Sequence, residues 1–564
     1  MTEAFFEYDF LDDRVIEQGY TIYHSAYIDQ PYILKLSANN WLCAFTKSDN
    51  KEGGVGTTIG ISFSKDKGKT WSFSQVLEQP SGPSASYAIP YLTSFGRIYV
   101  FYGYNEDNIT VSNSYSSRSD QVNKLCYKFS DDNGISWSGR QKLEIPVSAI
   151  DLNNEWQGRH QMFWSICKPV SANSEMYFAF TKIGNFSTFI GEGWIAKCAN
   201  INTEPDASKL NWSFFPSSAK GIRTESMGYI QEEHNIVPLN NGNFYCVYRT
   251  AKGYPAESYS KDGCKTWDRP VYAKYDNGYL IKNPRACTRV FKCANGKYLL
   301  WFHNNSTTWF GYRNPAWISG GIEKNGIIKW SQPEILLYSR DTSSKNSVSY
   351  PDLIEDSGDY YISETQKEQA RIHKIQKGLI EDLWGQGEKK ELIKNGLISH
   401  VTNFDSLNNT SFGTGSANWN GFTIELAFNL NSLNNQVILS TKNSSGNYAE
   451  VSVTDNGALA LNLFRNNSSI YSFTANLNLK ENKQNTVTIA MDDKSRIITI
   501  MLNGNLYDGG NADAFGWKRV PFNINYDIFN SPFFTTNFAG RMKRVKVYNR
   551  YLSTSEQVSN YYSN

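Results

Sequence analysis

An eight-residue pattern with Ser, Asp, Gly and Trp in fixed places occurs three times in the chain. The copies are SKDKGKTW at 64–71, SDDNGISW at 130–137 and SKDGCKTW at 260–267. The Asp can hydrogen-bond the backbone of its own turn, the Gly adopts a positive φ, and the Trp ring anchors the turn to adjacent strands. Three copies, each after a β-rich run, predict hairpin turns in a fold of repeated β-sheets. In the third copy Gly263 comes one place early and Cys264 fills the usual Gly site, so we expect that turn to be distorted.

A tryptophan recurs at similar intervals through the first two thirds of the chain, beside β-rich sequence. Repeats of this length that each supply four short strands fit a β-propeller, a ring of sheets with few exposed edges. The spacing predicts an all-β propeller of six blades, or of five if the last tryptophan, in the weaker context EDLWGQ, is outside the set. The repeated residues are Trp71, Trp137, Trp212, Trp267, Trp330 and Trp384.

The three turns resemble Asp-boxes, the hairpin turns of sialidase-like β-propellers. The resemblance to the sialidase superfamily covers about residues 20–380. It implies a catalytic propeller domain at 1–390, with a site where the inner strands and their loops converge. Asp-boxes are structural in that family, so they indicate the fold and not the chemistry.

The sequence changes character near residues 385–400, where GQGEKKELIKNGLISH is charged and has no strand pattern. Alternating segments such as FTIELAFNL and NTVTIAMD then follow, separated by Asn, Gly and Asp turns. The segment from Gly540, GRMKRVKVYNRYLSTSEQVSNYY, resembles the last strand and helical tail of laminin-G-like or concanavalin-like domains. The resemblance implies a jelly-roll β-sandwich at 398–564, a module of a kind that binds carbohydrate or packs on a partner domain. Since no dense Asp cluster assures a calcium site, we expect no metal and no other cofactor.

Charge and hydropathy limit the classes of partner. The formal net charge of +2 gives no reason to expect a nucleic acid or an anionic membrane as partner. No run of about 18 apolar residues predicts a membrane span. The start, MTEAFFEYDFLDD, lacks the basic and apolar regions of a signal peptide, so we expect a cytoplasmic protein, or a secreted or cell-surface one whose signal has been removed. The eight cysteines are scattered singly, which favours buried thiols over disulfides or metal ligands.

Four stretches resemble the sites of sialidases. The first, QEEHNIVPLNNGNFYCVYR at 231–249, resembles the segment in which a Glu opens one strand and an Arg ends the next. The resemblance places Glu233 on the glutamate that partners the catalytic residue, with Glu232 as the runner-up. It places Arg249 on an arginine that binds the substrate carboxylate.

The second stretch, LWFHNNSTTWFGYRNPAWISGG, contains Arg313 and resembles the region of the next such arginine. The planar guanidinium suits this role because it grips a carboxylate with two hydrogen bonds. Arg285 and Arg289, in NPRACTR, are alternatives for the same role.

The third stretch, SYPDLIEDSGDYYISETQ, resembles the run in which a Tyr precedes a strand that ends in Glu. The resemblance makes Tyr350 the nucleophile and Glu364 the brace of the arginine cluster. A tyrosine suits an anomeric carbon that bears a carboxylate, because an anionic Asp or Glu would be repelled there while a neutral phenol beside a Glu base would not.

The fourth stretch, YIDQPYILKLSANNWLCAF, departs from the family. Sialidases carry Arg-Ile-Pro here, whereas this chain has Asp29, Gln30 and Pro31, so one third of the carboxylate clamp is missing. We expect Gln30 to donate hydrogen bonds to a neutral sugar hydroxyl, and activity on sialosides to be weak or absent. The acid/base Asp of the family precedes the first Asp-box, where KSDNKEGGVG offers Asp49, with Glu52 as an alternative.

A fifth polar stretch, NNEWQGRHQMFW, has no counterpart in those motifs and contains Arg159 and His160. Histidine is the natural proton carrier near neutral pH. His160 beside Tyr350, with an arginine such as Arg159 to neutralise a uronate carboxylate, would suit β-elimination. His234, next to Glu233, is a similar candidate.

These residues favour a carbohydrate-active enzyme, an exo-acting glycoside hydrolase that removes an acidic or modified sugar from a glycan or polysaccharide. In that interpretation Asp49 is the acid/base, Tyr350 is the nucleophile activated by Glu233, and the arginines bind the substrate. One alternative is a polysaccharide lyase that cleaves a uronate glycan through His160 and Tyr350. A second alternative is a glycan-binding protein without catalytic activity.

Overall fold

A computed structural model describes residues 12–342, 347–402, 411–412, 421–442, 444, 446–520, 533–535 and 538–563. The chain forms two compact units that divide near residue 385, and 332–334 group with the second unit. Among the described residues, no helix has the length and apolar character that a membrane crossing requires.

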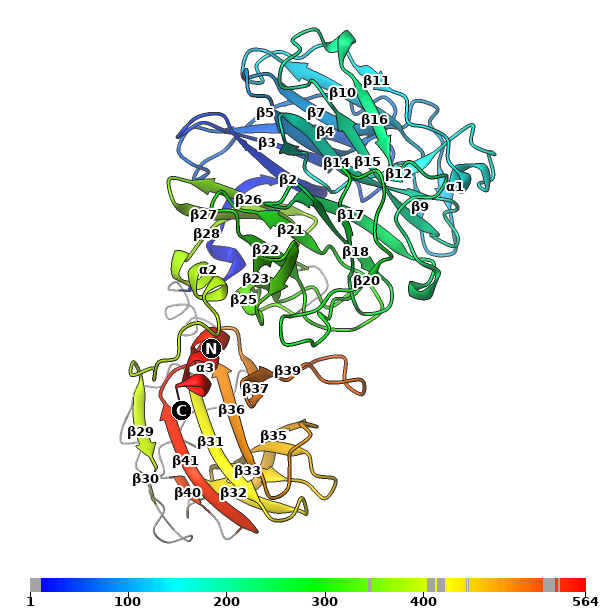
Figure 1. Cartoon of the computed structure of the whole chain (residues 1–564). Helices are drawn as coiled ribbons and strands as arrows, with labels where there is room; N and C mark the ends of the chain where they lie inside the picture. Colours follow the sequence, from blue (N-terminus) through cyan, green and yellow to red (C-terminus); the bar gives the residue numbers. More distant parts are fainter. Residues whose placement is uncertain are drawn as a thin grey trace. The chain divides into compact units, whose positions relative to one another are not determined.

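The first unit is a six-bladed β-propeller, a ring of six antiparallel sheets of four or five strands each (Figure 1). Aromatic and aliphatic side chains fill the space within and between the blades, and all eight cysteines are buried and free, as expected. The six sheets are β2 (Tyr27–Lys35), β3 (Trp41–Ser48), β4 (Thr58–Ser64) and β5 (Ser72–Val76); β6 (Ala85–Leu92), β7 (Ile98–Tyr104), β10 (Lys124–Ser130) and β11 (Gln141–Leu143); β12 (Met162–Trp164), β13 (Val170–Ala172), β14 (Glu175–Ile183), β15 (Gly191–Cys198) and β16 (Trp212–Phe215); β17 (Gln231–Pro238), β18 (Phe244–Thr250), β19 (Ala256–Ser260) and β20 (Val271–Tyr272); β21 (Arg289–Lys292), β22 (Tyr298–Phe302), β23 (Ala316–Lys324), β24 (Ile327–Trp330) and β25 (Glu334–Leu337); and β26 (Ser349–Asp356), β27 (Asp359–Thr365), β28 (Gln369–Ile375) and β1 (Tyr20–His24).

The ring closes through the sixth blade. There β1, from the start of the chain, pairs antiparallel with β28, and β26 packs against β2 of the first blade. This pairing covers the edge that an open ring would expose. The expectation of six blades is confirmed, but Trp384 does not mark a strand. It lies at the end of the helix α2 (Lys377–Trp384), and β1 completes the last sheet.

The Asp-box turns share one hydrogen-bond pattern. In the first turn, Gly68 N donates to Ser64 Oγ at 2.8 Å and Thr70 N donates to Asp66 Oδ1 at 2.9 Å. Trp71 Nε1 donates to the carbonyl oxygen of Gly68 at 2.9 Å, which fixes the ring against the turn. Each box therefore satisfies its own backbone groups within one short segment.

The third Asp-box is not distorted, contrary to expectation. Cys264 N donates to Ser260 Oγ at 3.0 Å, and Trp267 Nε1 donates to Cys264 O at 3.1 Å. Gly263 has φ +71° and Cys264 has φ +73°, so Cys264 itself occupies the left-handed region that glycine fills in the other copies. The hydrogen bonds of the box hold a non-glycine residue in this strained conformation.

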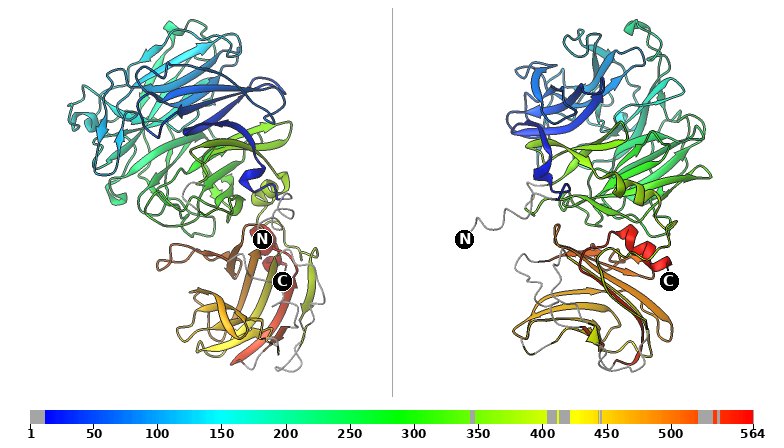
Figure 2. Two further views of the ribbon diagram at one scale, coloured as in Figure 1. Left: turned by 180° about the vertical axis from the view of Figure 1, so that it is seen from behind. Right: turned by 90° about the vertical axis from the view of Figure 1, so that its left-hand side faces the viewer.

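The second unit is a β-sandwich of two antiparallel sheets (Figure 2). Its core consists of apolar side chains from both sheets, such as Ile424 and Leu426 of one sheet and Leu461 of the other, which are almost fully buried. The helix α3 (Thr554–Tyr562) begins at a capping box between Ser553 and Glu556. The two sheets are β29 (Leu397–Val401), β41 (Gly540–Tyr548), β31 (Phe422–Leu430), β36 (Gln484–Asp492), β37 (Ile497–Leu502), β38 (Asn505–Leu506) and β39 (Trp517–Arg519); and β30 (Ser411–Phe412), β40 (Phe533–Thr535), β32 (Gln436–Ser440), β33 (Tyr448–Val453), β34 (Leu459–Arg465) and β35 (Ser468–Ala475).

The first Asp-box offers a test of how its turn contributes to stability. Gly68 has φ +82°, and a Cβ there would lie 3.0 Å from Trp41 Cζ3. We expect Gly68→Ala to lower the free energy of unfolding by about 2–4 kcal/mol, because left-handed strain and crowding add. Gly96→Ala is the matched control, since Gly96 has φ +94° with open space around its Cβ, and strain alone should cost about 1–2 kcal/mol. Equal losses for the two variants in chemical denaturation would show that packing against Trp41 is unimportant.

Candidate active site

Four blades have a β-bulge near the start of their first strand. The register shifts after Asp29 in β2, Ser86 in β6, Glu232 in β17 and Ser349 in β26. A bulge re-aims the side chain that it carries, and positive φ at residues other than glycine concentrates at functional sites. The residues that follow these shifts have positive φ: Gln30 (+53°), Tyr87 (+67°), Glu233 (+58°) and Tyr350 (+49°).

Two of these bulges bring a tyrosine and a glutamate together. Tyr350 Oη donates a hydrogen bond of 2.7 Å to Glu233 Oε1, and Arg249 Nη1 lies 2.7 Å from the same oxygen. Burial raises the pKa of Glu233, although the charge of Arg249 opposes that effect. Burial also raises the pKa of Tyr350, so its phenol is neutral in the free protein. Glu233 is therefore placed to accept the proton of Tyr350.

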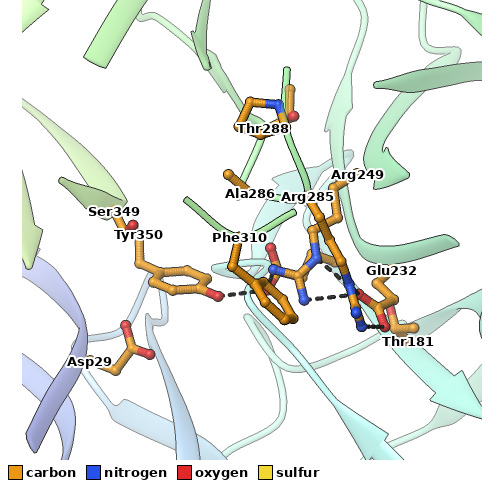
Figure 3. A network of polar contacts seen from close by, with 12 residues as sticks. Asp29, Thr181, Glu232, Arg249, Arg285, Ala286, Thr288, Phe310, Ser349 and Tyr350 are labelled. Atoms are coloured by element: carbon orange, nitrogen blue, oxygen red, sulfur yellow. Dashed lines mark hydrogen bonds and ion pairs between the residues drawn. The ribbon is translucent and has the colours of Figure 1, made fainter. Parts of the chain in front are cut away.

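Glu232 holds two arginines beside this pair. Its Oε2 accepts hydrogen bonds from Arg249 Nε at 3.0 Å and Arg285 Nε at 3.2 Å, and its Oε1 accepts one from Arg285 Nη2 at 2.7 Å. Burial raises the pKa of Glu232, but the two guanidinium charges outweigh it and lower the pKa overall. Figure 3 shows these side chains pointing toward one another, with Phe310 beside them, its ring 4.4 Å from the Arg285 guanidinium.

Arg313, in the loop between β22 and β23, has neutral hydrogen-bond partners. Its Nε donates to Phe310 O at 2.8 Å, its Nη1 to Ser349 Oγ at 3.0 Å and its Nη2 to Arg285 O at 3.3 Å. None of these partners is a carboxylate, and only 6% of Arg313 is exposed. A buried guanidinium that is bonded only to neutral oxygens favours an incoming anionic group.

Asp29 lies beside Tyr350 (Figure 3), whereas Gln30 is engaged inside the propeller. Gln30 Nε2 donates to Ser165 O at 2.7 Å, and the residue is 1% exposed. Asp29 accepts hydrogen bonds from Tyr27 Oη at 2.8 Å and from Lys367 Nζ at 2.6 Å. The expectation that Gln30 contacts a sugar is wrong, because the bulge places its neighbour Asp29 at the site instead.

Two further expected substrate contacts lie in the core. Glu364 accepts hydrogen bonds from His373 Nε2 at 3.1 Å and from Gln366 Nε2, so Glu232 and not Glu364 braces the arginines. His234 is fully buried, with Nδ1 2.9 Å from Thr181 Oγ1. Burial lowers the pKa of His234 to about 3, so this histidine is a neutral packing residue.

The residues of the fifth polar stretch are not bonded to Tyr350. His160 Nδ1 lies 3.3 Å from Asp107 Oδ2, and its ring packs edge-on against Trp156. Arg159 is exposed, and its Nε donates to Trp156 O at 3.2 Å. Arg289, the alternative arginine for binding the substrate, is also not bonded to Tyr350. It is buried, and its guanidinium lies 4.8 Å from the centroid of the Tyr32 ring.

The two candidates for the acid/base residue differ in their surroundings. Asp49 is exposed, and the hydrogen bond from Lys47 lowers its pKa. Glu52 pairs with Arg118 at 3.1 Å. Desolvation raises the pKa of Glu52, but the positive charges of Lys367, Arg118 and Arg313 prevail and lower the pKa to about 2. Glu52 is thus the candidate that interacts with the arginine cluster.

Sequence reasoning missed Asp29, Lys367 and Phe310 as members of this site. Asp29 and its neighbours could have been found, because the departure from Arg-Ile-Pro marks their position. Lys367 is in a hairpin turn and Phe310 is in a loop, and neither has a local pattern that indicates a role.

Two family descriptions match the chain. The BNR repeat-like domain matches residues 40–362, and the Concanavalin A-like lectin/glucanases superfamily matches residues 405–558. Among curated proteins, none matches the sequence significantly.

Solved structures similar to the chain include three bacterial and protozoan proteins. A Dyadobacter fermentans protein of unknown function is 16% identical, covers 63% of this chain and 98% of its own, and has a TM-score of 0.46. A Trypanosoma rangeli sialidase in complex with sialic acid is 12% identical, with coverage of 96% and 94% and a TM-score of 0.42. The intramolecular trans-sialidase of Ruminococcus gnavus is 14% identical, with coverage of 64% and 98% and a TM-score of 0.42.

The brace of the arginines can be tested through stability. Glu232→Gln removes the carboxylate that binds Arg249 and Arg285, so we expect a loss of about 3–5 kcal/mol near neutral pH, as for other broken buried ion pairs. Because the folded pKa of Glu232 is lowered, its contribution is present above the ordinary carboxyl range and is lost as the pH falls through that folded pKa. The difference from the parent should therefore shrink in acid.

The matched control is Glu225→Gln, at an exposed position in the 3-10 helix η3 (Glu225–Met227), which should change stability by about 0.5 kcal/mol or less. Urea denaturation across a pH series measures both variants. If Glu232→Gln behaved like this control at every pH, the arginines would be held by other contacts.

Proposed function

The chain belongs to the BNR repeat-like domain family, and we propose that its propeller is a glycoside hydrolase that removes an acidic or modified sugar from a glycan. The observation that carries this proposal is the buried 2.7 Å hydrogen bond between Tyr350 and Glu233. A nucleophile within hydrogen-bond reach of a general base, itself oriented by a third group, is the arrangement that covalent catalysis requires. Arg249 is that third group.

The arrangement supports a two-step displacement. In the first step the phenol proton of Tyr350 passes to Glu233, the phenolate oxygen bonds to the anomeric carbon, and the glycosidic oxygen leaves with its electron pair and takes a proton from the protonated acid/base carboxyl group. In the second step the same group, now a carboxylate, deprotonates a water that attacks this carbon, and the released Tyr350 oxygen recovers its proton from Glu233. Among the described residues Glu233 Oε2 is buried and has no hydrogen-bond partner, so this oxygen keeps the capacity to accept a further hydrogen bond.

The charge of the site supports an acidic substrate. Arg249 and Arg285 are bonded to Glu232, whereas the hydrogen-bond partners of Arg313 are all neutral. We propose that Arg313 binds the anionic group of the substrate. For the acid/base role, Glu52 is better placed than Asp49, because Glu52 interacts with Lys367 and Arg313 while Asp49 pairs with Lys47.

A hydrolase and a lyase would differ here in the residue on which activity depends and in the product formed. We expect Glu233→Gln to lower kcat/KM on an acidic glycoside by about 10²–10⁴-fold, the usual size of a general-base effect. His160→Ala should have a much smaller effect, because His160 contacts Asp107 and Trp156 and not Tyr350. The product should gain the mass of one water.

Thermal melting of both variants controls for misfolding. The reverse order of effects, together with an unsaturated product that absorbs in the ultraviolet, would establish a lyase. Binding of glycans without turnover by the folded parent protein would support a binding protein instead.

The first blade has no arginine where sialidases carry one, and this difference bears on activity toward sialosides. Because Asp29, paired with Lys367, stands beside Tyr350 where sialidases have an arginine, a sialoside carboxylate would lack one of its guanidinium partners there. We expect kcat/KM on an aryl sialoside to be at least about a hundredfold below that on the preferred acidic glycoside, a ratio typical of a mismatched buried polar contact. Comparable turnover of both in one assay would contradict this assignment of Asp29.

A further inference from the structure

Lys367 is a cation at the site that the proposed mechanism does not use. It lies in the turn between β27 and β28 and has φ +74°. Lys367 N donates to Thr365 Oγ1 at 2.9 Å, and Lys367 O accepts from Ile28 N at 2.7 Å. Thr365 Oγ1 in turn donates to Ile28 O at 2.8 Å. These bonds join the turn to the first blade and hold a strained backbone in one conformation.

The ammonium group of Lys367 lies on the face of Tyr350. Its Nζ is 4.5 Å from the centroid of the Tyr350 ring and 5.4 Å from that of Tyr27. Asp29 Oδ2 lies 2.6 Å from the same nitrogen, and Glu52 Oε2 lies 3.9 Å away. Lys367 is 26% exposed, so water screens this charge only in part.

The position of this cation has a direct bearing on a tyrosine nucleophile. As the phenol proton moves to Glu233, negative charge develops on the Tyr350 ring and oxygen, and a nearby cation stabilises that charge. The other charged groups that act on Tyr350 are Glu233 and Asp29, which oppose the phenolate, and Arg249 and Arg313, which favour it.

We infer that Lys367 is a positioning residue for Tyr350: held by Asp29, its ammonium group lies over the face of the Tyr350 ring and stabilises the phenolate during attack. The cation thus comes from the sixth blade, and Asp29 of the first blade holds it in the region where the related motif has an arginine. This inference rests on the proposed hydrolase function but concerns an electrostatic coupling that is measurable without turnover.

The coupling can be measured by fluorine NMR on protein in which 3-fluorotyrosine replaces Tyr350 alone. In Lys367→Met we expect the ionisation midpoint of this residue to rise by about one pH unit, the size expected when one nearby cation is removed. Lys367→Arg should restore the midpoint. Lys374→Met is the matched control, because Lys374 is an exposed lysine of the neighbouring strand that pairs with Asp359, and it should leave the midpoint unchanged.

Asp29→Asn should shift the ionisation midpoint in the opposite direction, so it serves as a second test if Lys367→Met fails to fold. Removing this carboxylate should lower the midpoint of the fluorotyrosine, since Asp29 opposes the phenolate. With the natural tyrosine in place, kcat/KM of Lys367→Met on the acidic glycoside should fall about tenfold, as the same one-unit shift requires, and recover in Lys367→Arg.

The outcomes separate the two proposals. A shifted midpoint in a protein that turns over no glycoside would support the Lys367–Tyr350 coupling and overturn the hydrolase function. Identical midpoints in Lys367→Met and Lys374→Met, or an unchanged midpoint in Asp29→Asn, would overturn the role of Lys367.

Discussion

In four blades the first strand shifts register within its first few residues, and the backbone there takes a conformation that few side chains adopt. A regular strand sends successive side chains to opposite faces, so it offers no way to aim two neighbours at one point. The bulges in β17 and β26 change those directions, and Tyr350 and Glu233 meet although they are far apart in sequence. The strain costs about 1–3 kcal/mol per residue, and the closed ring of sheets holds the residues in place.

Charge balance is the second determinant of the site. Glu232 offsets one of the two positive charges of Arg249 and Arg285, Arg249 also pairs with Glu233, and Lys367 pairs with Asp29. Buried ions that are paired and hydrogen-bonded are tolerated, whereas burying an unpaired ion lowers the free energy of unfolding by on the order of several kcal/mol. Arg313 is bonded only to neutral oxygens, so a substrate anion would complete the balance. The remaining positive charge is the basis of the anionic substrate that we propose.

Residue patterns predicted the parts of this molecule that depend on local structure. The Asp-boxes and the recurring tryptophans indicated a six-bladed propeller, because each box forms its hydrogen bonds within a few residues. The pairing of Tyr350 with Glu233 matches the expected partners, although their chemical roles stay predictions. The error at Gln30 has a physical reason: at a bulge, side-chain direction does not follow strand alternation, so the departure from Arg-Ile-Pro marks this stretch but not which of its side chains lies beside Tyr350. Lys367 reaches the site across the closure of the ring, a contact that no short-range pattern reports.

In the proposed mechanism Tyr350 attacks the anomeric carbon with Glu233 as its base, and this attack forms a covalent intermediate. Mass spectrometry of peptides from the protein after incubation with a fluorinated acidic glycoside tests this claim directly, because the fluorine slows release of the covalent intermediate. We expect one glycosyl group on the peptide that contains Tyr350, and far less glycosylated peptide from the Glu233→Gln variant. Labelling of a different residue, or cleavage of the glycoside by the parent protein without any covalent adduct, would contradict it.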